Sequence, residues 1–322
     1  MSDGDMTIVC GDCRDVMASM PERSVECCVT SPPYFGCRTY DGQGEDSIGA
    51  EDSPQAYVSR LASCFDGVMR VLKDDGTLWL NVGDCFARRN YGKIRRKEQI
   101  GVPAMLALVM RERGWRLRQD VIWSKPNAMP ESVRDRFTCC HEHVMLFTKS
   151  EDYYFSYEDS LEECVTTSSK FGGNKYAGQD HRYGGVRRKE HVQAVRDIRF
   201  GGSKYGDSDD PHHGGKSGKV WHPASKVVDG VEVPVRKMRD VWILSAAQYG
   251  GEHFATFPER LVRPCILIGC PPGGTVMDPF SGAGTTGLVA LKNGRRYVGI
   301  EVSQRYCDMQ RERIEAALKE ER

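Results

Sequence analysis

The motif Ser31-Pro32-Pro33-Tyr34 directly follows the apolar stretch Val25–Val29, which has the character of a short buried strand. Proline has no backbone N–H and a fixed φ, so the two prolines cannot continue a strand ladder. Ser31 therefore ends a strand on a stiff turn. The turn offers hydrogen-bond acceptors (a hydroxyl and a proline carbonyl) and an aromatic face, both of which a flipped-out nucleobase with an exocyclic amino group needs. By itself the motif also fits a plain strand-to-turn corner that packs a tyrosine.

A glycine-rich turn near the other end of the chain follows the apolar stretch 275–277 and precedes a predicted helix. A strand, a glycine-rich turn and a helix form a nucleotide-type pocket, because glycines let a ligand approach the backbone. Glu301 ends the next predicted strand, where an acid accepts hydrogen bonds from ribose hydroxyls. Gly282, Gly284 and Gly287 nearly complete the dinucleotide fingerprint. The Asp-Pro-Phe that precedes them is not typical of a dehydrogenase.

The letters D-P-F-S-G-A-G-T at 278–285 and V-T-S-P-P-Y at 29–34 together resemble the DNA amino-methyltransferases that use S-adenosylmethionine. The order of catalytic half, recognition insert and cofactor half resembles the group called beta. The resemblance covers residues 7–150 and 240–319. It includes I-W-S-K-P-N-A-M-P-E-S-V-R-D-R at 122–136 and F-P-E-R-L-V at 257–262.

The resemblance implies an α/β protein with the Rossmann-like methyltransferase fold, a seven-stranded, mostly parallel sheet with one reversed strand, and a circularly permuted order of motifs. Residues 1–150 would form the catalytic half of the core and 240–322 the cofactor-binding half, with 151–239 as an inserted target-recognition region. Both motifs stand at strand ends, so we expect Ser31 and Gly282 to share one cavity. The predicted strands are 7–10, 25–29, 77–82, 117–123, 143–148, 275–278 and 296–300.

The resemblance also implies the site. S-adenosylmethionine would lie across 278–284, with its ribose hydroxyls on Glu301 and its adenine amino group on Asp12. A target base would stack on Tyr34, while Ser31 and the Pro32 carbonyl accept from its amino group. The catalytic residues would be Ser31, Pro32, Pro33 and Tyr34. The cofactor-binding residues would be Asp12, Asp278, Pro279, Phe280, Ser281, Gly282, Gly284, Thr285, Thr286 and Glu301.

A serine in the first position of the catalytic motif resembles the enzymes that methylate cytosine N4, whereas aspartate or asparagine is commoner in those that methylate adenine N6. We therefore expect cytosine N4, with adenine N6 as the alternative. Carbon-5 methylation would need a cysteine nucleophile, and Cys265 in Pro264-Cys265 lies in a predicted apolar helix instead. A nucleic-acid-binding relative without turnover, and a methyltransferase for small molecules or proteins, are the other interpretations left open.

Lysine and arginine (45) balance aspartate and glutamate (45), so a basic surface for nucleic acid must be local. We expect double-stranded DNA as partner, with phosphate contacts from two basic stretches. No apolar run is long enough to span a bilayer, and the acidic start is unlike a signal peptide, which predicts a cytoplasmic protein with reduced thiols. A homodimer and a cognate restriction endonuclease are further partners that the resemblance suggests. The expected DNA contacts are Arg95, Arg96, Lys97, Arg187, Arg188 and Lys189.

We predict no metal site. The run Cys139-Cys140-His141-Glu142-His143 contains metal-ligating residue types. Its spacing does not match a zinc site, and its last residue begins a predicted strand. We interpret the run as structural.

Overall fold

The computed structural model describes residues 5–36, 47–163, 225–228, 231–246 and 257–320. The chain divides into two compact units. One combines Met1–Leu161 with Lys237–Arg322, and the other is Glu162–Arg236. Within the described part, no helix has the length and apolar character needed to cross a membrane.

The first unit is built on an eight-stranded sheet. Strands β3 and β4 both run antiparallel to β5, and every other neighbouring pair is parallel. All seven predicted segments are strands, and the expectation of a mostly parallel sheet with one reversed strand is confirmed. The order across the sheet is β1 (Met6–Cys10), β11 (Arg296–Glu301), β10 (Thr275–Asp278), β2 (Val25–Thr30), β3 (Leu72–Val82), β5 (His141–Thr148), β4 (Arg116–Ser124) and β9 (Val241–Ile243).

The sheet differs from the sequence prediction mainly in having an eighth strand and in the start of β3; the other strands differ by at most two residues at an end. The eighth strand, β9, is only three residues long and pairs with the edge of β4 through Ile122 and Val241. A segment this short carries too little alternation to be recognised from sequence. Strand β3 starts at Leu72 rather than at 77, because its pairing with β2 shifts register and takes up the polar residues 73–76 as an irregularity in the strand.

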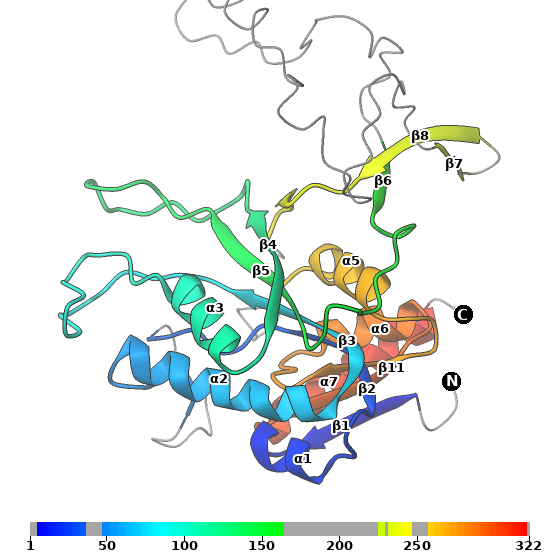
Figure 1. Cartoon of the computed structure of the whole chain (residues 1–322), viewed down its shortest axis with the longest axis horizontal. Helices are drawn as coiled ribbons and strands as arrows, with labels where there is room; N and C mark the ends of the chain where they lie inside the picture. Colours follow the sequence, from blue (N-terminus) through cyan, green and yellow to red (C-terminus); the bar gives the residue numbers. More distant parts are fainter. Residues whose placement is uncertain (1–4, 37–46, 164–224, 229–230, 247–256, 321–322) are drawn as a thin grey trace, which may run out of the picture. The chain divides into compact units, whose positions relative to one another are not determined.

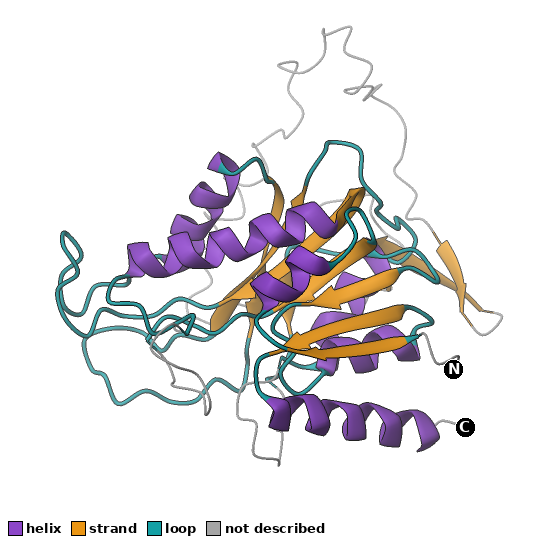
Figure 2. Cartoon of the chain, turned by 90° about the horizontal axis from the view of Figure 1, so that it is seen from below, coloured by secondary structure: helices purple, strands orange, loops and turns teal. Residues whose placement is uncertain are grey.

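Helices cover both faces of the sheet (Figures 1 and 2). Successive side chains of a strand point to opposite faces. Accordingly, Cys28 and Leu78 belong to one apolar cluster, and Cys27 and Trp79 belong to the other. The first cluster includes residues of α1 (Cys13–Ser19), α2 (Pro54–Val71) and α3 (Val102–Glu112). The second includes residues of α5 (Glu259–Gly269), α6 (Thr285–Lys292) and α7 (Gln304–Glu320).

Helix α2 illustrates how the sequence forms these layers. Ser53 caps it by accepting a hydrogen bond from the Ala56 N–H at 3.2 Å, and Pro54 occupies the first turn. Its buried residues recur every three or four positions, as expected of a helix with one apolar face. These residues include Tyr57, Leu61, Phe65 and Val68.

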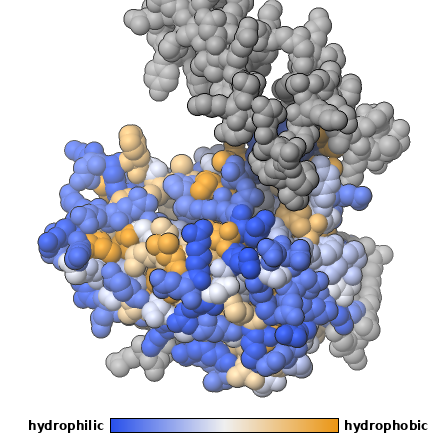
Figure 3. All heavy atoms as spheres, viewed as in Figure 1, coloured by the Kyte–Doolittle hydropathy of each residue, from blue (hydrophilic) through white to orange (hydrophobic). Residues whose placement is uncertain are grey.

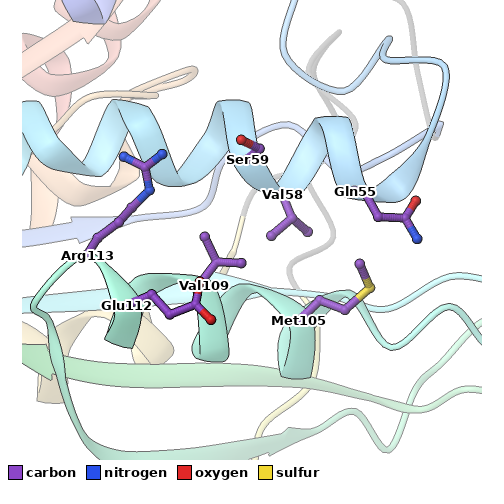
Figure 4. A pocket seen from close by; sticks show the side chains of 7 residues that line it. All are labelled: Gln55, Val58, Ser59, Met105, Val109, Glu112 and Arg113. Carbon is purple, nitrogen blue, oxygen red and sulfur yellow. The ribbon is translucent and has the colours of Figure 1, made fainter.

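Residues of helices α2 and α3, with Arg113 just beyond α3, line an open surface hollow of about 440 Å³ (Figure 4). None of its lining residues belongs to the predicted site. They are Gln55, Val58, Ser59, Met105, Val109, Glu112 and Arg113. Side chains on the face shown in Figure 3 are mostly hydrophilic, with small apolar groups between them.

The second unit contains a three-stranded sheet in the order β6 (Leu161–Glu163), β8 (Val231–Lys237) and β7 (Ser225–Val228). Arg236 pairs with Glu162 at 2.8 Å between Nε and Oε1. Most of the predicted target-recognition region, including Arg187, Arg188 and Lys189, lies outside the described residues. The assignment of 151–239 to target recognition remains a prediction.

The centre of the eight-stranded sheet is the place where its connections diverge. Strands β10 and β2 are parallel neighbours, with Val276 opposite Cys27 and Met277 opposite Cys28. From β2 the chain passes through α2 on one face to β3, and from β10 it passes through α6 on the other face to β11. Open α/β sheets bind ligands outside the carboxyl ends of strands at such a point. Both sequence motifs begin there.

Candidate active site

A buried carboxylate joins the two motifs. Asp278, at the end of β10, is 1% exposed. Its Oδ1 accepts from the Thr30 hydroxyl at 2.6 Å and from the Phe280 N–H at 3.1 Å, and its Oδ2 accepts from the Thr286 hydroxyl at 2.7 Å. Thr30 and Asp278 are 248 positions apart in sequence. Asp278 therefore ties the end of β2, the glycine-rich turn and the start of α6 together. Its predicted contact with a cofactor remains a prediction.

Ionisation of the Asp278 carboxyl is expected to lower the free energy of unfolding, and this can be tested. Burial raises its pKa from 3.8 to about 6, despite hydrogen bonds from Thr30, Thr286 and Phe280 that favour the charged form. The pKa of Asp278 is higher in the folded than in the unfolded protein, so the neutral carboxyl contributes to the free energy of unfolding. This contribution is fully present below about pH 4 and is lost as the pH rises through about 6. At about 1.4 kcal/mol per pH unit, the loss amounts to about 3 kcal/mol.

We expect Asp278→Asn to lack this loss. The amide oxygen can accept from Thr30 and Phe280, and its N–H can donate to Thr286, whose hydroxyl lies 3.3 Å from the Val29 carbonyl and can donate there. Guanidinium unfolding at about pH 5 and about pH 8 checks this. The free energy of unfolding of Asp278→Asn, relative to that of wild type, should be higher at about pH 8 than at about pH 5. Asp278→Ala, which leaves buried donors without an acceptor, should be less stable by about 2–4 kcal/mol at both pH values. A difference between wild type and Asp278→Asn that does not change with pH would contradict the expectation.

The glycine-rich turn has a backbone that other residues adopt poorly. Gly282 and Gly284 have φ angles of 48° and 75°, in the left-handed region. The Gly282 N–H donates to Glu301 Oε2 at 2.9 Å, and the Ser303 N–H donates to Oε1 at 3.0 Å. A Cβ on Gly284 would lie 2.7 Å from the Cβ of Gln310. The turn is thus held in one shape between the end of β11 and helix α7.

The third glycine of the fingerprint serves packing. A Cβ on Gly287 would lie 2.4 Å from the ring of Tyr297, which is 1% exposed on β11. Helix α6 can therefore approach the sheet closely only with glycine there. Arg313 of α7 donates to the Ala283 carbonyl at 2.8 Å and to the Thr285 hydroxyl at 3.0 Å, and so holds the other side of the turn.

Asp12, the predicted acceptor for adenine, stands just after β1 and caps α1. The preceding Gly11 donates its N–H to the Glu301 carbonyl at 2.9 Å, which brings the two acidic residues to neighbouring strand ends. Both carboxylate oxygens of Asp12 accept from Arg14, at 2.9 Å and 2.6 Å. This pairing lowers the pKa of Asp12 and keeps it ionised. A ligand amino group would share the carboxylate with Arg14.

The Ser-Pro-Pro-Tyr turn is fixed by close contacts. The Tyr57 hydroxyl of α2 donates to the Pro33 carbonyl at 2.8 Å. A Cβ on Gly83, just beyond β3, would lie 2.9 Å from the ring of Tyr34, so only glycine leaves room for this ring position. Burial, together with the neighbouring Glu142 carboxylate, raises the pKa of Tyr34 well above its usual value, so its hydroxyl stays protonated.

Three polar residues that the sequence analysis did not select also contribute to this turn. Asn81 of β3 donates from Nδ2 to the Tyr34 hydroxyl at 2.9 Å and to Ser31 Oγ at 3.3 Å. Glu142 of β5 accepts from the Tyr34 hydroxyl at 2.7 Å and from Asn81 Nδ2 at 2.9 Å, and Lys125 binds its other oxygen. Glu142 belongs to the run 139–143, interpreted above as structural, and its contacts with Tyr34 and Asn81 show which turn it holds. A polar Asn81 within the apolar stretch 77–82 was the one signal available in the sequence.

Comparison with known proteins identifies the family. A family model described as DNA methylase, for the N6 and N4 amino-methyltransferases, matches residues 25–312. The chain belongs to this DNA methylase family. It is 34% identical to the type II methyltransferase M.Cfr9I of Citrobacter freundii, over 96% of this chain and 87% of the relative. It is also 34% identical to M.SmaI of Serratia marcescens, over 95% and 90%.

Solved structures support the methyltransferase fold of this DNA methylase. The PvuII DNA methyltransferase, described as cytosine-N4-specific, superposes with a TM-score of 0.60 at 18% identity, over 97% of this chain and 93% of that one. A putative DNA modification methylase from Thermus thermophilus, solved with S-adenosyl-L-methionine, has a TM-score of 0.56 at 23% identity, over the same fractions. The predicted Rossmann-like methyltransferase fold is confirmed.

The residues at the strand tips fit S-adenosylmethionine, the cofactor of this DNA methylase family. The turn 278–284 has glycines with left-handed backbone, which bring main chain rather than side chain to a ligand, and it leads directly into helix α6. The carboxylate of Glu301 lies beside this turn. Among the described residues, no group of three or more histidine, cysteine or acidic side chains is arranged to hold a metal ion.

Of the basic residues expected to contact DNA, the described ones lie in the loop between β3 and α3. Arg95, Arg96 and Lys97 are exposed there. Lys97 forms an ion pair with Asp135 at 2.8 Å. In the contacts that hold the loop, the two arginines use backbone groups: their N–H groups donate to Glu98 and Asn90, and the Arg95 carbonyl accepts from the Glu98 N–H. A role for these residues in binding DNA stays a prediction.

Proposed function

We propose that this DNA methylase transfers a methyl group from S-adenosylmethionine to the N4 amino group of a cytosine that has flipped out of duplex DNA. The observation that carries the proposal is the junction at Asp278. Through Thr30 and Thr286 it places the Ser-Pro-Pro-Tyr turn and the glycine-rich turn at adjacent strand ends. An amine acceptor and a nucleotide-type turn then face the same edge of the sheet.

The target amine would be prepared by the turn 31–34. The ring of Tyr34 provides a stacking face for the base, and Ser31 Oγ and the Pro32 carbonyl accept hydrogen bonds from its amino group. These acceptors draw the nitrogen lone pair out of conjugation with the ring, so the nitrogen becomes a nucleophile without a covalent intermediate on the enzyme. Positioning and fixed dipoles supply the rate enhancement. Cys265 is buried in α5, which fits direct transfer better than attack by a thiolate.

The cofactor would be held by the glycine-rich half of the site. When bound, S-adenosylmethionine supplies an electrophilic methyl group on a sulfonium. Glu301 would accept from its ribose hydroxyls, and Asp12 would accept from its adenine amino group. The turn would enclose the remainder of the cofactor through Asp278, Pro279, Phe280, Ser281, Gly282, Gly284, Thr285 and Thr286.

The first test is methylation of plasmid DNA, followed by digestion and mass spectrometry of the nucleosides. We expect N4-methylcytosine. N6-methyladenine alone would refute the choice of base and favour the alternative amine. Binding of S-adenosylmethionine without transfer to any duplex would favour a non-catalytic relative. Single-molecule sequencing of the same plasmid then gives the position and the recognition sequence.

Contact with DNA phosphates through the loop between β3 and α3 is tested by the double variant Arg95→Ala/Arg96→Ala. We expect a higher KM for DNA and an unchanged affinity for S-adenosylmethionine, because the two exposed guanidinium groups would neutralise phosphates. The slope of log K against log salt for DNA binding should fall in magnitude by about 2. Arg311→Ala/Arg305→Ala, on helix α7, is the control. An unchanged salt slope would exclude the loop from the DNA interface.

The names of the two bacterial relatives describe type II methyltransferases. We therefore infer that the protein acts at a specific duplex sequence and has a cognate restriction endonuclease. We also propose, from the resemblance to the beta group alone, that it works as a homodimer. Sedimentation equilibrium of the full chain, with and without a duplex that carries the site found by sequencing, tests the last inference. A monomer under both conditions would refute it.

A further inference from the structure

The hydrogen bonds around Ser31 have a direction that can be worked out from their partners. A carboxylate only accepts hydrogen bonds, and an ammonium group only donates them. Glu142 Oε1 binds the Lys125 ammonium, and Oε2 lies 2.7 Å from the Tyr34 hydroxyl. The single proton of Tyr34 must therefore point at Glu142, and its oxygen is left to accept from other groups.

Glu142 also sets the direction of the hydrogen bonds that the Asn81 side chain makes. Its Nδ2 lies 2.9 Å from Glu142 Oε2, so one amide N–H donates to that carboxylate. The second N–H points toward the Tyr34 oxygen and Ser31 Oγ, at 2.9 Å and 3.3 Å. The opposite amide orientation would place two acceptors, Asn81 Oδ1 and the carboxylate, against each other. Glu142 thus also decides which atom of Asn81 faces Ser31.

Ser31 is the last residue in this chain of hydrogen bonds from Glu142 through Tyr34 and Asn81. Its Oγ lies 3.4 Å from the Tyr34 oxygen, whose proton is already directed to Glu142. Any hydrogen bond between these two hydroxyls is therefore donated by Ser31. With its proton turned toward Tyr34 and one lone pair facing Asn81, Ser31 retains a lone pair for a further donor. The hydrogens of an exocyclic amine are donors of that kind.

We propose that Glu142 is a positioning residue that makes Ser31 an acceptor toward the target amine, by setting the direction of the hydrogen bonds through Tyr34 and Asn81. The proposal rests on the proposed function, in which Ser31 receives that amine. Glu142 is well placed for the role, because its side chain is 15% exposed and Lys125, at 19%, holds its second oxygen. It touches neither substrate nor cofactor in this scheme and acts through Tyr34 and Asn81.

The substitution Glu142→Gln tests the direction rather than the presence of these bonds. The ammonium of Lys125 repels an amide N–H, so it draws the carbonyl of the introduced glutamine toward itself and turns the NH2 toward Tyr34. That NH2 donates to the Tyr34 oxygen and also faces Asn81, so the Asn81 amide turns to present Oδ1 in place of Nδ2. The Tyr34 proton then points to Asn81 Oδ1 or to Ser31 Oγ, and Ser31 no longer receives the Asn81 N–H. Wherever Tyr34 donates to Ser31, the serine proton is free to turn toward the target amine. We expect kcat to fall roughly 10- to 30-fold, with the Kd for S-adenosylmethionine within about twofold of wild type.

A second substitution separates reversed direction from simple damage. Tyr34→Phe keeps the stacking ring and removes the oxygen through which the introduced glutamine would reach Ser31. We expect Tyr34→Phe alone to lower kcat about threefold, and the double variant Tyr34→Phe/Glu142→Gln to recover to that level. If Glu142 made only a structural contact, the double variant would be as slow as Glu142→Gln, or slower.

Glu26 offers a matched control at the opposite end of the strands. It is a largely buried glutamate on β2 that also binds a lysine, Lys73, at 2.6 Å, and it accepts from the Thr275 N–H at 2.7 Å. Glu26→Gln should reduce stability by a similar amount to Glu142→Gln and leave kcat unchanged. Both variants are assayed as the full chain, with plasmid DNA and tritiated S-adenosylmethionine.

The outcomes separate this inference from the proposed function. Wild-type kcat in Glu142→Gln, or a double variant that does not recover, would overturn the role of Glu142 and leave the methylation proposal standing. If wild type transfers no methyl to DNA, the proposed function fails, but guanidinium unfolding still tests the order of hydrogen bonds. The shifts in unfolding midpoint for Tyr34→Phe and Glu142→Gln should then be non-additive in the double variant, and strict additivity would overturn the inference.

Discussion

Replacing Ser31 by alanine is expected to lower kcat for DNA methylation by about 10²- to 10³-fold, the size of effect seen when one fixed hydrogen-bonding group is removed from a reacting centre. The hydrogen bonds of Ser31 Oγ to described side chains go to Asn81 and Tyr34, at 3.3 Å and 3.4 Å, and not to the glycine-rich turn, so its removal should not disturb that turn. The affinity for S-adenosylmethionine, measured by calorimetry, should stay within about threefold of wild type.

Ser24→Ala is the matched control for this prediction. Ser24 precedes the same strand, β2, at its opposite end, and its hydroxyl donates to the Pro21 carbonyl at 2.8 Å. It should retain wild-type kcat. Equal rates for Ser31→Ala and Ser24→Ala would remove Ser31 from the chemistry, and an equal loss of cofactor binding in Ser31→Ala would assign it to the cofactor half instead.

The second large effect is expected from Gly284→Ala, which should weaken the binding of S-adenosylmethionine by at least about 10²-fold. Two causes act together. The φ of 75° costs a residue with a Cβ about 1 kcal/mol, and the new Cβ would lie 2.7 Å from the Cβ of Gln310. Because a backbone-attached atom cannot rotate away, the turn or helix α7 must move. Such overpacking costs about 1–3 kcal/mol of stability in addition.

Gly294→Ala distinguishes the two causes. Gly294 has a φ of 69°, close to that of Gly284, but no atom lies within 4 Å of a Cβ placed there. This control should lose only about 1 kcal/mol of stability and bind S-adenosylmethionine normally. Calorimetric Kd values and guanidinium midpoints for both variants give the answer. Normal binding by Gly284→Ala would mean that the turn at 278–284 does not hold the cofactor.

The local parts of the site could be predicted from the sequence because their causes are local. Prolines at 32 and 33 end β2 wherever the strand lies, and the left-handed backbone at Gly282 and Gly284 requires glycine whatever packs around it. The seven predicted strands were found for the same reason, since a short apolar run bounded by turn residues is a property of each segment. The neighbouring positions of β2 and β10 were also expected, because the motifs that follow these strands both resemble those of the DNA amino-methyltransferases.

Tertiary structure decided which residues stand behind the Ser-Pro-Pro-Tyr turn. Glu142 looks like an ordinary polar residue at the start of a strand, yet it contacts Tyr34 across 108 positions of sequence because β5 runs antiparallel between β3 and β4. Asn81 lies opposite Val144 on the neighbouring strand, and this register brings it to the same edge of the sheet as Glu142. By itself the sequence predicted the carboxyl ends of seven strands and the residues expected to react there. Which of the other strands are neighbours, and in which register, depends on packing both faces of the whole sheet at once, and only the folded chain establishes it.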